Sequence, residues 1–167
     1  MFQVGDAVSY GTSGVCAITD CKKVRLAGKL CDCYILEPVY DHSMRICVPC
    51  GSEVLVQRMH ALPSREELMA LLREPAPQHE LDPGLRREQY RRTLQSGDRR
   101  ALLGMVRDLY TERRRRHAAG RQLSGYEDSA LREAQNILYS EFAYTLGIAP
   151  GEVPAFIARA LGDSEEA

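Results

Sequence analysis

The sequence predicts an α+β protein of two domains, a small antiparallel β domain followed by a compact all-α helical bundle. Before residue 63, short β-prone runs alternate with turn residues. After it, apolar residues recur at the three- to four-residue spacing of an amphipathic helix. Three prolines then interrupt the helical pattern between residues 75 and 83. We therefore expect a β domain at residues 1–62, a helix and proline-rich linker at 63–83, a helical domain at 84–162 and an acidic tail at 163–167.

The first half contains four short runs that we predict to be strands. Turn-forming residues separate them, including Gly11–Gly14 and Ala27-Gly28-Lys29. So many strands within about 55 residues indicate a small, strongly bent sheet or barrel. Such a sheet has exposed edges to which a partner can add a strand. The predicted strands are Ala7–Tyr10, Val15–Thr19, Cys33–Glu37 and Arg45–Val48.

Helix-capping residues mark the starts of the predicted helices in the second half. Ser64 and Ser124 are each followed three residues later by Glu, which is the spacing of a capping box. The helix over residues 86–95 stops at Ser96-Gly97, and Asp98 can cap the next one. Pro150 begins the last helix. We expect a compact bundle of about four helices after the linker.

Charge is strongly segregated along a chain whose net charge is only −1. Residues 1–63 hold six basic and six acidic side chains, whereas residues 84–121 hold twelve arginines against four acids. From residue 122 onward there are two arginines and eight acids. This pattern predicts a polyanion partner for the middle segment. The alternative is a set of solvated helix faces, with the arginines at helix ends favoured by the helix dipole.

We expect no catalytic residues, no cofactor and no small-molecule substrate. The four histidines are scattered, and the sequence has neither a phosphate-binding glycine loop with its lysine nor a nucleophile elbow. No stretch approaches the roughly eighteen apolar residues that a membrane span needs, so we expect no membrane association. The N-terminus does not resemble a signal peptide, which predicts a cytoplasmic protein.

All six cysteines fall within the first 50 residues. Cys47 and Cys50 have the spacing of half a zinc site or of a redox pair. Cys31 and Cys33 lack that spacing, and both would lie on one face of a strand. We favour structural thiols, which behave as small buried hydrophobic groups, and we expect no metal. A zinc- or redox-responsive regulator that uses these cysteines remains an alternative.

An ordered set of motifs resembles the CarD/CdnL family of bacterial transcription regulators. Each motif is short, but together they run in family order from residue 2 to about residue 161. The motifs are Val4-Gly5-Asp6-Ala7-Val8-Ser9-Tyr10 with Gly14-Val15, Cys33-Tyr34-Ile35-Leu36, Ile46-Cys47-Val48-Pro49, Tyr90 and Leu94 with Ser96-Gly97-Asp98, Val106-Arg107-Asp108-Leu109, and Ala134-Gln135-Asn136-Ile137-Leu138.

The resemblance implies a Tudor-like domain that contacts the RNA polymerase β subunit, partly by pairing of strand edges. It also implies a helical domain on promoter DNA at the upstream edge of the melted bubble. Such a protein stabilises the open complex with little specificity for DNA sequence. It would act in the cytoplasm, on the nucleoid. Family members often carry a Trp wedge near the start of the residue 86–95 helix. This chain has no Trp and has Pro83 at that place, with Leu85 nearby.

Two groups of candidate site residues follow from the residues and the resemblance together. For the polymerase we expect a charged segment and an edge strand: Lys22, Lys23, Arg25, Arg45, Ile46, Cys47, Val48 and Pro49. For the DNA phosphate backbone and minor groove we expect Leu85, Arg86, Arg87, Arg91, Arg92, Arg113, Arg114, Arg115, Arg116, Arg121 and Arg132. The alternative is a protein-only module that binds polymerase, or another partner with a matching β edge, and has little DNA affinity.

Overall fold

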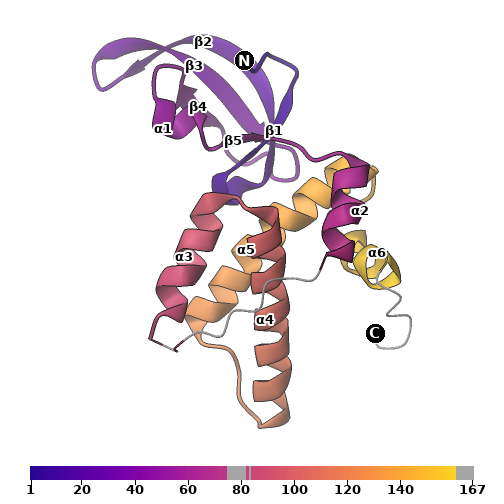
Figure 1. The fold of residues 1–167 in the computed structure, drawn as a ribbon. Helices are drawn as coiled ribbons and strands as arrows, with labels where there is room; N and C mark the ends of the chain where they lie inside the picture. Colours follow the sequence, from indigo (N-terminus) through magenta and orange to yellow (C-terminus); the bar gives the residue numbers. More distant parts are fainter. Residues whose placement is uncertain (75–81, 83, 161–167) are drawn as a thin grey trace. The chain divides into compact units, whose positions relative to one another are not determined.

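The computed structural model describes residues 1–74, 82 and 84–160 (Figure 1). The chain divides into two compact units, Met1–Leu62 and Pro63–Ala167. The first is a β-sheet unit and the second is helical, which confirms the predicted α+β class. Most of the expected proline-rich linker, residues 75–81 and 83, lies outside the described residues, as does the acidic tail at 163–167.

Within the described residues, the first unit holds one antiparallel sheet of five strands in the order β4-β3-β2-β1-β5. A single 3-10 turn, η1 (Gly11–Ser13), follows the first strand, and a short helix, α1 (Glu53–Val56), precedes the last. The strands are β1 (Ala7–Tyr10), β2 (Val15–Leu26), β3 (Lys29–Pro38), β4 (Ile46–Pro49) and β5 (Met59–Ala61).

Strands β2 and β3 form a hairpin much longer than the sequence predicts. The predicted strand ends at Thr19, but β2 continues to Leu26, past a register shift between Ile18 and Asp20. The turn is made by Ala27 and Gly28, whose φ angles of 47° and 82° fit the two-residue turn that joins twisted strands. The prediction was wrong here because the added residues are mostly exposed, so no apolar alternation marks them.

Apolar side chains from all five strands form the core of the sheet unit. Val8, Ile18, Leu36 and Val48 are all almost completely buried. Met59 joins them from β5, the strand that the sequence did not reveal. Strand β5 is only three residues long, and it is held by antiparallel pairing with β1. The core therefore fixes which face of each strand points inward.

The second unit contains five α-helices in its described residues. Helices α3, α4 and α5 lie side by side (Figure 1). A 3-10 turn, η2 (Pro150–Glu152), separates the last two helices. The helices are α2 (Arg65–Arg73), α3 (Arg86–Ser96), α4 (Arg99–Ala118), α5 (Gly125–Leu146) and α6 (Val153–Ala160).

The caps of α2, α4 and α5 and the end of α3 lie where the sequence predicts them, whereas the last helix begins at Val153 and not at Pro150, which starts the 3-10 turn η2. Ser64 and Ser124 both form capping boxes with the Glu three residues on. Asp98 accepts hydrogen bonds from two backbone amides at the start of α4. Gly97 ends α3 with φ at 66°, a left-handed conformation that favours glycine. Local sequence signals therefore set the boundaries of these helices.

Helix α2 belongs to the helical unit, although the sequence predicts it to be part of the linker segment at residues 63–83. Leu68 and Leu72 are buried in the same apolar core as Leu102 of α4 and Phe142 of α5. The Thr145 hydroxyl of α5 also donates a hydrogen bond to the Pro63 carbonyl, 2.9 Å away. The chain therefore enters the helical unit at Pro63.

A buried ion pair joins the start of α4 to the last third of α5. The Nε of Arg99 lies 2.6 Å from an oxygen of Glu141, whose side chain is only 3% exposed. A carboxylate so deeply buried needs a charged partner, because an unpaired charge is costly to remove from water. The pair therefore fixes how α4 and α5 are aligned.

Candidate functional site

Strand β4 forms one edge of the sheet and pairs with β3 alone among the described strands. Its register places Ile46 opposite Leu36 and Pro49 opposite Cys33. Val48 points into the core, whereas Ile46, Cys47 and Pro49 are partly exposed. The residues predicted to dock on polymerase therefore include a complete edge strand, the part of a sheet that can accept a strand from a partner.

Arg45 immediately precedes this edge strand and is 75% exposed. Its Nε lies 2.9 Å from a carboxylate oxygen of Glu37 on the neighbouring strand β3. Exposed ion pairs of this kind contribute little free energy, so Arg45 can exchange Glu37 for an acidic group of a partner.

The hairpin carries Lys22, Lys23 and Arg25, all exposed, on its β2 strand. Because side chains alternate along a strand, Lys23 and Arg25 lie on one face and Lys22 on the other. Lys22 pairs with Cys33, which in turn pairs with Pro49. The structure thus places Lys22 in a cross-strand row with the edge strand and separates it from Lys23 and Arg25.

The cysteines of the sheet unit are all free thiols. Burial raises the pKa of Cys16 to about 11. Burial, together with a hydrogen bond to Cys47, raises the pKa of Cys33 to about 12. Burial is also the main cause of the raised pKa of Cys50, with Cys21 adding to it. These three groups are therefore protonated at neutral pH, the less reactive form of a thiol.

Metal ligation was the second possible role for these cysteines. Within residues 1–74, 82 and 84–160, no three His, Cys, Asp or Glu side chains are grouped so as to hold a metal ion. Cys33 and Cys47 contact each other as a pair, and Cys50 contacts Cys21 as another. The spacing of the cysteines in the sequence therefore did not predict which thiols contact each other, because the pairing of the strands determines those contacts.

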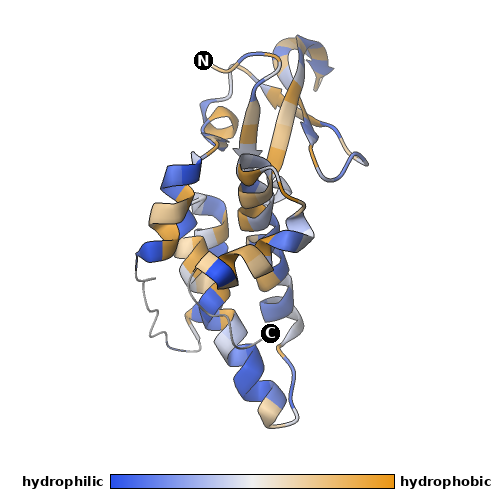
Figure 2. Cartoon of the chain, turned by 90° about the vertical axis from the view of Figure 1, so that its right-hand side faces the viewer, coloured by the Kyte–Doolittle hydropathy of each residue, from blue (hydrophilic) through white to orange (hydrophobic). Residues whose placement is uncertain are grey.

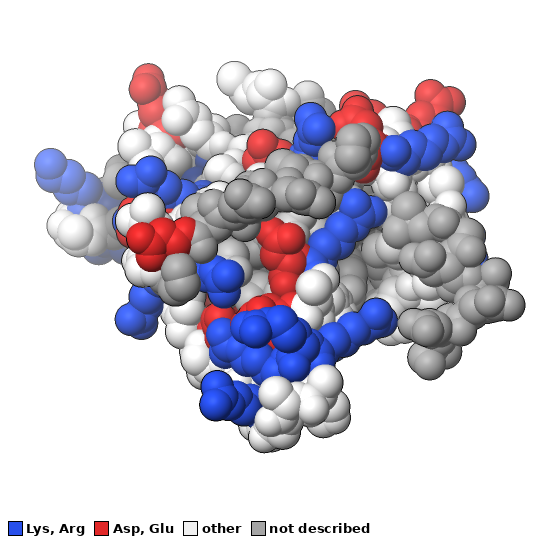
Figure 3. All heavy atoms as spheres, turned by 60° about the horizontal axis from the view of Figure 1, so that its bottom comes forward, with Lys and Arg blue, Asp and Glu red and all other residues white. Residues whose placement is uncertain are grey.

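The helical unit carries the ten arginines predicted to meet DNA, most of them exposed, and we call this set the arginine surface. In Figure 3, basic side chains gather around the end of α4, with acidic side chains among them. The last turns of α4 are mostly hydrophilic (Figure 2). The arginine surface consists of Arg86, Arg87, Arg91, Arg92, Arg113, Arg114, Arg115, Arg116, Arg121 and Arg132.

Half of the arginine surface is neutralised by nearby acids within the described residues. Glu88 binds both Arg91 and Arg92, at 2.6 and 3.1 Å. The hydrogen bond from Arg91 is the main reason that the pKa of Glu88 is lowered. On α5, Arg132 pairs with Asp128 at 2.8 Å. These acids lie three or four residues before their partners, the spacing at which helical side chains meet.

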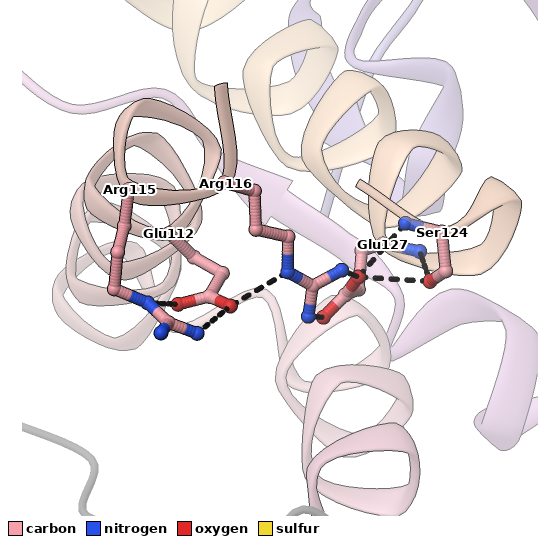
Figure 4. A network of polar contacts seen from close by, with 5 residues as sticks. All are labelled: Glu112, Arg115, Arg116, Ser124 and Glu127. Carbon is pink, nitrogen blue, oxygen red and sulfur yellow. Dashed lines mark hydrogen bonds and ion pairs between the residues drawn. The ribbon is translucent and has the colours of Figure 1, made fainter. Parts of the chain in front are cut away.

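Figure 4 shows the network that neutralises Arg115 and Arg116. Glu112 accepts hydrogen bonds from both arginines at 2.7 Å. Chiefly because of the bond from Arg115, the pKa of Glu112 is lowered to about 2. Arg116 then makes two bonds to Glu127 of α5, at 2.6 and 3.0 Å.

Glu127 is both the partner of Arg116 and the acid of the capping box that opens α5. It accepts hydrogen bonds from the backbone and the hydroxyl of Ser124, at 3.0 and 2.9 Å. Although burial opposes ionisation, the bonds from Ser124 and Arg116 lower the pKa of Glu127. The end of α4 is thereby fastened to the start of α5, so Arg116 is largely structural.

Five members of the arginine surface form no ion pair with a described acid. The guanidinium groups of Arg87 and Arg113 stack over the rings of Tyr126 and Tyr110, at 4.7 and 4.5 Å. Such stacking keeps the positive charge available while limiting the motion of the side chain. The five are Arg86, Arg87, Arg113, Arg114 and Arg121.

The starts of α3 and α5 and the end of α4 meet at one end of the helical unit. Arg86, Arg87 and Arg116 line a common pocket there. Leu85, the N-cap of α3, is 60% exposed immediately before Arg86. An exposed apolar side chain and two unneutralised cations are therefore neighbours in this part of the unit.

Sequence reasoning missed the acids that neutralise half of the arginine surface. The pairs formed by Glu88 and Glu112 have visible signals, because the acids and arginines are three or four residues apart on predicted helices. The bond from Arg116 to Glu127 has no such signal, since it joins different helices. The count of arginines and acids in the sequence therefore overestimated how many guanidinium groups of the arginine surface have no ion-pair partner.

The structure combines a sheet unit that has an open edge with a helical unit that carries clustered arginines. Residues 2–60 match the family model described as CarD-like/TRCF RID domain, and residues 67–158 match the one described as CarD, C-terminal domain. The chain therefore belongs to the CarD family, whose members are regulators that interact with RNA polymerase.

No curated protein sequence showed significant similarity to the chain. Among the described helices, none is long and apolar enough to cross a membrane.

Proposed function

We propose that this protein is a bacterial transcription regulator that docks on the β subunit of RNA polymerase and contacts promoter DNA to stabilise the open complex. It acts in the cytoplasm, on the nucleoid. Phosphate contacts from arginines position the helical unit on the duplex without reading its sequence. The observation that carries the DNA contact is the cluster formed by Arg86, Arg87 and the exposed Leu85 at the start of α3.

The edge strand β4 supports the docking part of the proposal. It offers backbone groups along Ile46–Pro49 and has the exposed Arg45 at its start. The hairpin supplies further positive charge through Lys22, Lys23 and Arg25. A partner strand with acidic flanks would match both features.

Charge reversal tests the docking surface. The double variant Arg25→Glu and Arg45→Glu should lose co-purification with polymerase, because it replaces attraction with repulsion at both segments. Arg58→Glu is the matched control, since Arg58 is an exposed cation of the same unit outside both segments. Retention of polymerase by the double variant would move the docking surface elsewhere.

The lifetime of the open complex tests the function itself. Adding the protein to polymerase on a promoter should lengthen the lifetime of the melted complex after challenge with a competitor. The double variant at Arg25 and Arg45 should leave the lifetime unchanged, because it cannot be recruited. An equal lifetime with and without the wild-type protein would refute the proposed activity.

A protein-only module that binds polymerase is the second candidate. Two observations favour it: the acids that neutralise half of the arginine surface, and the absence of Trp from the sequence. Binding of the full chain to unrelated duplexes at increasing salt separates the two candidates. Affinity that falls steeply with salt supports DNA contact, whereas undetectable binding at low salt supports the protein-only module.

A further inference from the structure

The pocket at one end of the helical unit has a volume of about 260 Å³. Helix α3 contributes Arg86, Arg87 and Tyr90 to its lining. Helix α4 contributes Arg116, and the start of α5 contributes Tyr126 and Glu127. Three helices thus converge on a hollow that holds several cations and two aromatic rings.

The charge available in this pocket is positive. Arg116 and Glu127 neutralise each other through two hydrogen bonds, and Glu112 binds the same arginine from the other side. Arg86 and Arg87 have no described acid as an ion-pair partner. The guanidinium groups of Arg86 and Arg87 are therefore available to bind an anion. The neighbouring side of the pocket, formed by Arg116 and Glu127, carries no net charge.

The second arginine is held in place by an aromatic side chain. The guanidinium of Arg87 lies 4.7 Å from the centre of the Tyr126 ring. The Tyr126 hydroxyl donates a hydrogen bond to the backbone carbonyl of Arg87, 2.6 Å away. This double contact orders Arg87 before any ligand arrives, which lowers the entropy lost on binding.

Tyr90 adds a hydrogen-bond donor to the pocket lining. Its side chain is buried, with only 5% of the residue exposed, and it lines the pocket. Its ring is stacked on that of Tyr126, with 6.4 Å between centroids. Its hydroxyl forms no hydrogen bond with the described residues, and it is not one of the fully buried polar atoms left without a partner. As part of the pocket lining, it can donate to an incoming acceptor.

We propose that this pocket binds one phosphate group, with Arg86 and Arg87 pairing with its oxygens and the Tyr90 hydroxyl donating a further hydrogen bond. Planar guanidinium groups bind phosphate oxygens in a bidentate manner, and a tetrahedral oxyanion can accept bonds from three directions. The phosphate belongs either to a free phosphorylated compound or to a nucleic-acid backbone. The site uses the same two arginines as the DNA contact proposed above, so for a backbone phosphate it rests on that proposal, whereas for a free compound it does not.

Titration of the full chain with inorganic pyrophosphate tests the site directly. At constant ionic strength, the side-chain N–H resonances of Arg86 and Arg87 in ¹H–¹⁵N NMR spectra should shift and saturate. Arg86→Gln should weaken binding by about tenfold, the loss expected for one hydrogen bond to a charged group. Tyr90→Phe keeps the stacked ring and should weaken binding severalfold through loss of the hydroxyl alone.

Arg113→Gln is the matched control, because it removes one unpaired arginine of the same unit outside the pocket lining. It should change pyrophosphate affinity by less than about twofold, the effect of an exposed and screened charge. Equal weakening by Arg113→Gln and Arg86→Gln would refute the site, since it would indicate diffuse attraction. Shifts that fail to saturate would refute it as well.

A short duplex without terminal phosphates distinguishes the two sources of phosphate. If the duplex shifts the Arg86 and Arg87 resonances and pyrophosphate displaces it, the pocket takes a backbone phosphate. If the duplex leaves these resonances unchanged while pyrophosphate binds, the pocket takes a free phosphorylated compound. Both outcomes support the pocket, and only the second is compatible with failure of the proposed DNA contact.

Discussion

The division of the arginine surface into paired and unpaired members leads to a quantitative prediction about DNA binding. We compare two double variants that remove the same charge: Arg113→Gln with Arg114→Gln, and Arg91→Gln with Arg92→Gln. The first pair has no described acid as a partner, whereas Glu88 holds the second pair at 2.6 and 3.1 Å. The unpaired residues should therefore make the larger contribution to phosphate binding.

The expected size follows from counterion release. Each phosphate contact contributes about 0.9 to the slope of log affinity against log salt, so loss of two contacts should flatten the slope by about 1.8. The Arg91 and Arg92 variant should flatten it by less than about 1, because these side chains must leave Glu88 before they contact phosphate. Fluorescence anisotropy with a labelled duplex, at five or more salt concentrations, measures both slopes.

Two results would refute this reasoning. Equal flattening by both double variants would mean that the ion pairs to Glu88 do not withhold the arginines from DNA. An unchanged slope for the Arg113 and Arg114 variant would mean that the end of α4 does not contact phosphate. All four residues are exposed, so circular dichroism should show unchanged helix content in both variants.

Three further predictions concern the stability of the helical unit. Glu141→Ala should lower the free energy of unfolding by about 3 kcal/mol, because it leaves Arg99 without its buried partner, and urea unfolding measures the change. Ser124→Ala should cost about 1 kcal/mol through loss of the α5 cap, whereas Ser124→Thr should restore most of it. The pKa of Glu112 is lower in the folded protein than its ordinary value of 4.5, so its stabilising effect is present above that pH and is lost as the pH falls towards 2. Glu112→Gln should therefore make unfolding less dependent on pH in this window, and an identical pH profile for variant and wild type would contradict the assigned ion pairs.

Helix boundaries could be predicted because their signals are local. The capping boxes at Ser64 and Ser124 need only four consecutive residues, and Gly97 needs only its own backbone conformation. The same holds for the start of α4 at Asp98. Physical causes that act within one turn of chain leave a readable pattern in the sequence.

Features that depend on contacts between distant segments could not be predicted in this way. Strand β5 has three residues, and its existence depends on pairing with β1 about fifty residues earlier in the chain. The outer half of the hairpin is exposed, so no buried alternation marks its strands. The ion pair between Arg116 and Glu127 likewise needs α4 and α5 to be packed before the two side chains meet.

The edge strand has a particular hydrogen-bonding polarity. The Cys50 amide donates to the Asp32 carbonyl of β3, at 2.8 Å. Because the direction of the backbone N–H and C=O groups alternates along an antiparallel strand, the amide of Val48 also faces β3. The backbone N–H and C=O groups at positions 47 and 49 therefore face outward. Position 49 is proline, which has no N–H. Within β4 as described, the outer side therefore offers one donor, the Cys47 amide, and the carbonyl acceptors of Cys47 and Pro49.

Because the outer side of β4 has more hydrogen-bond acceptors than donors, its backbone favours a partner strand that supplies donors. A strand that docks there is held mainly by hydrogen bonds that it donates itself, so its own outward-facing amides must be free. Two copies of this edge, each short of donors, would leave carbonyls unmatched if they paired with each other, which disfavours growth of a shared sheet between molecules. One proline thus leaves the edge open to a foreign strand while discouraging aggregation of the protein with itself.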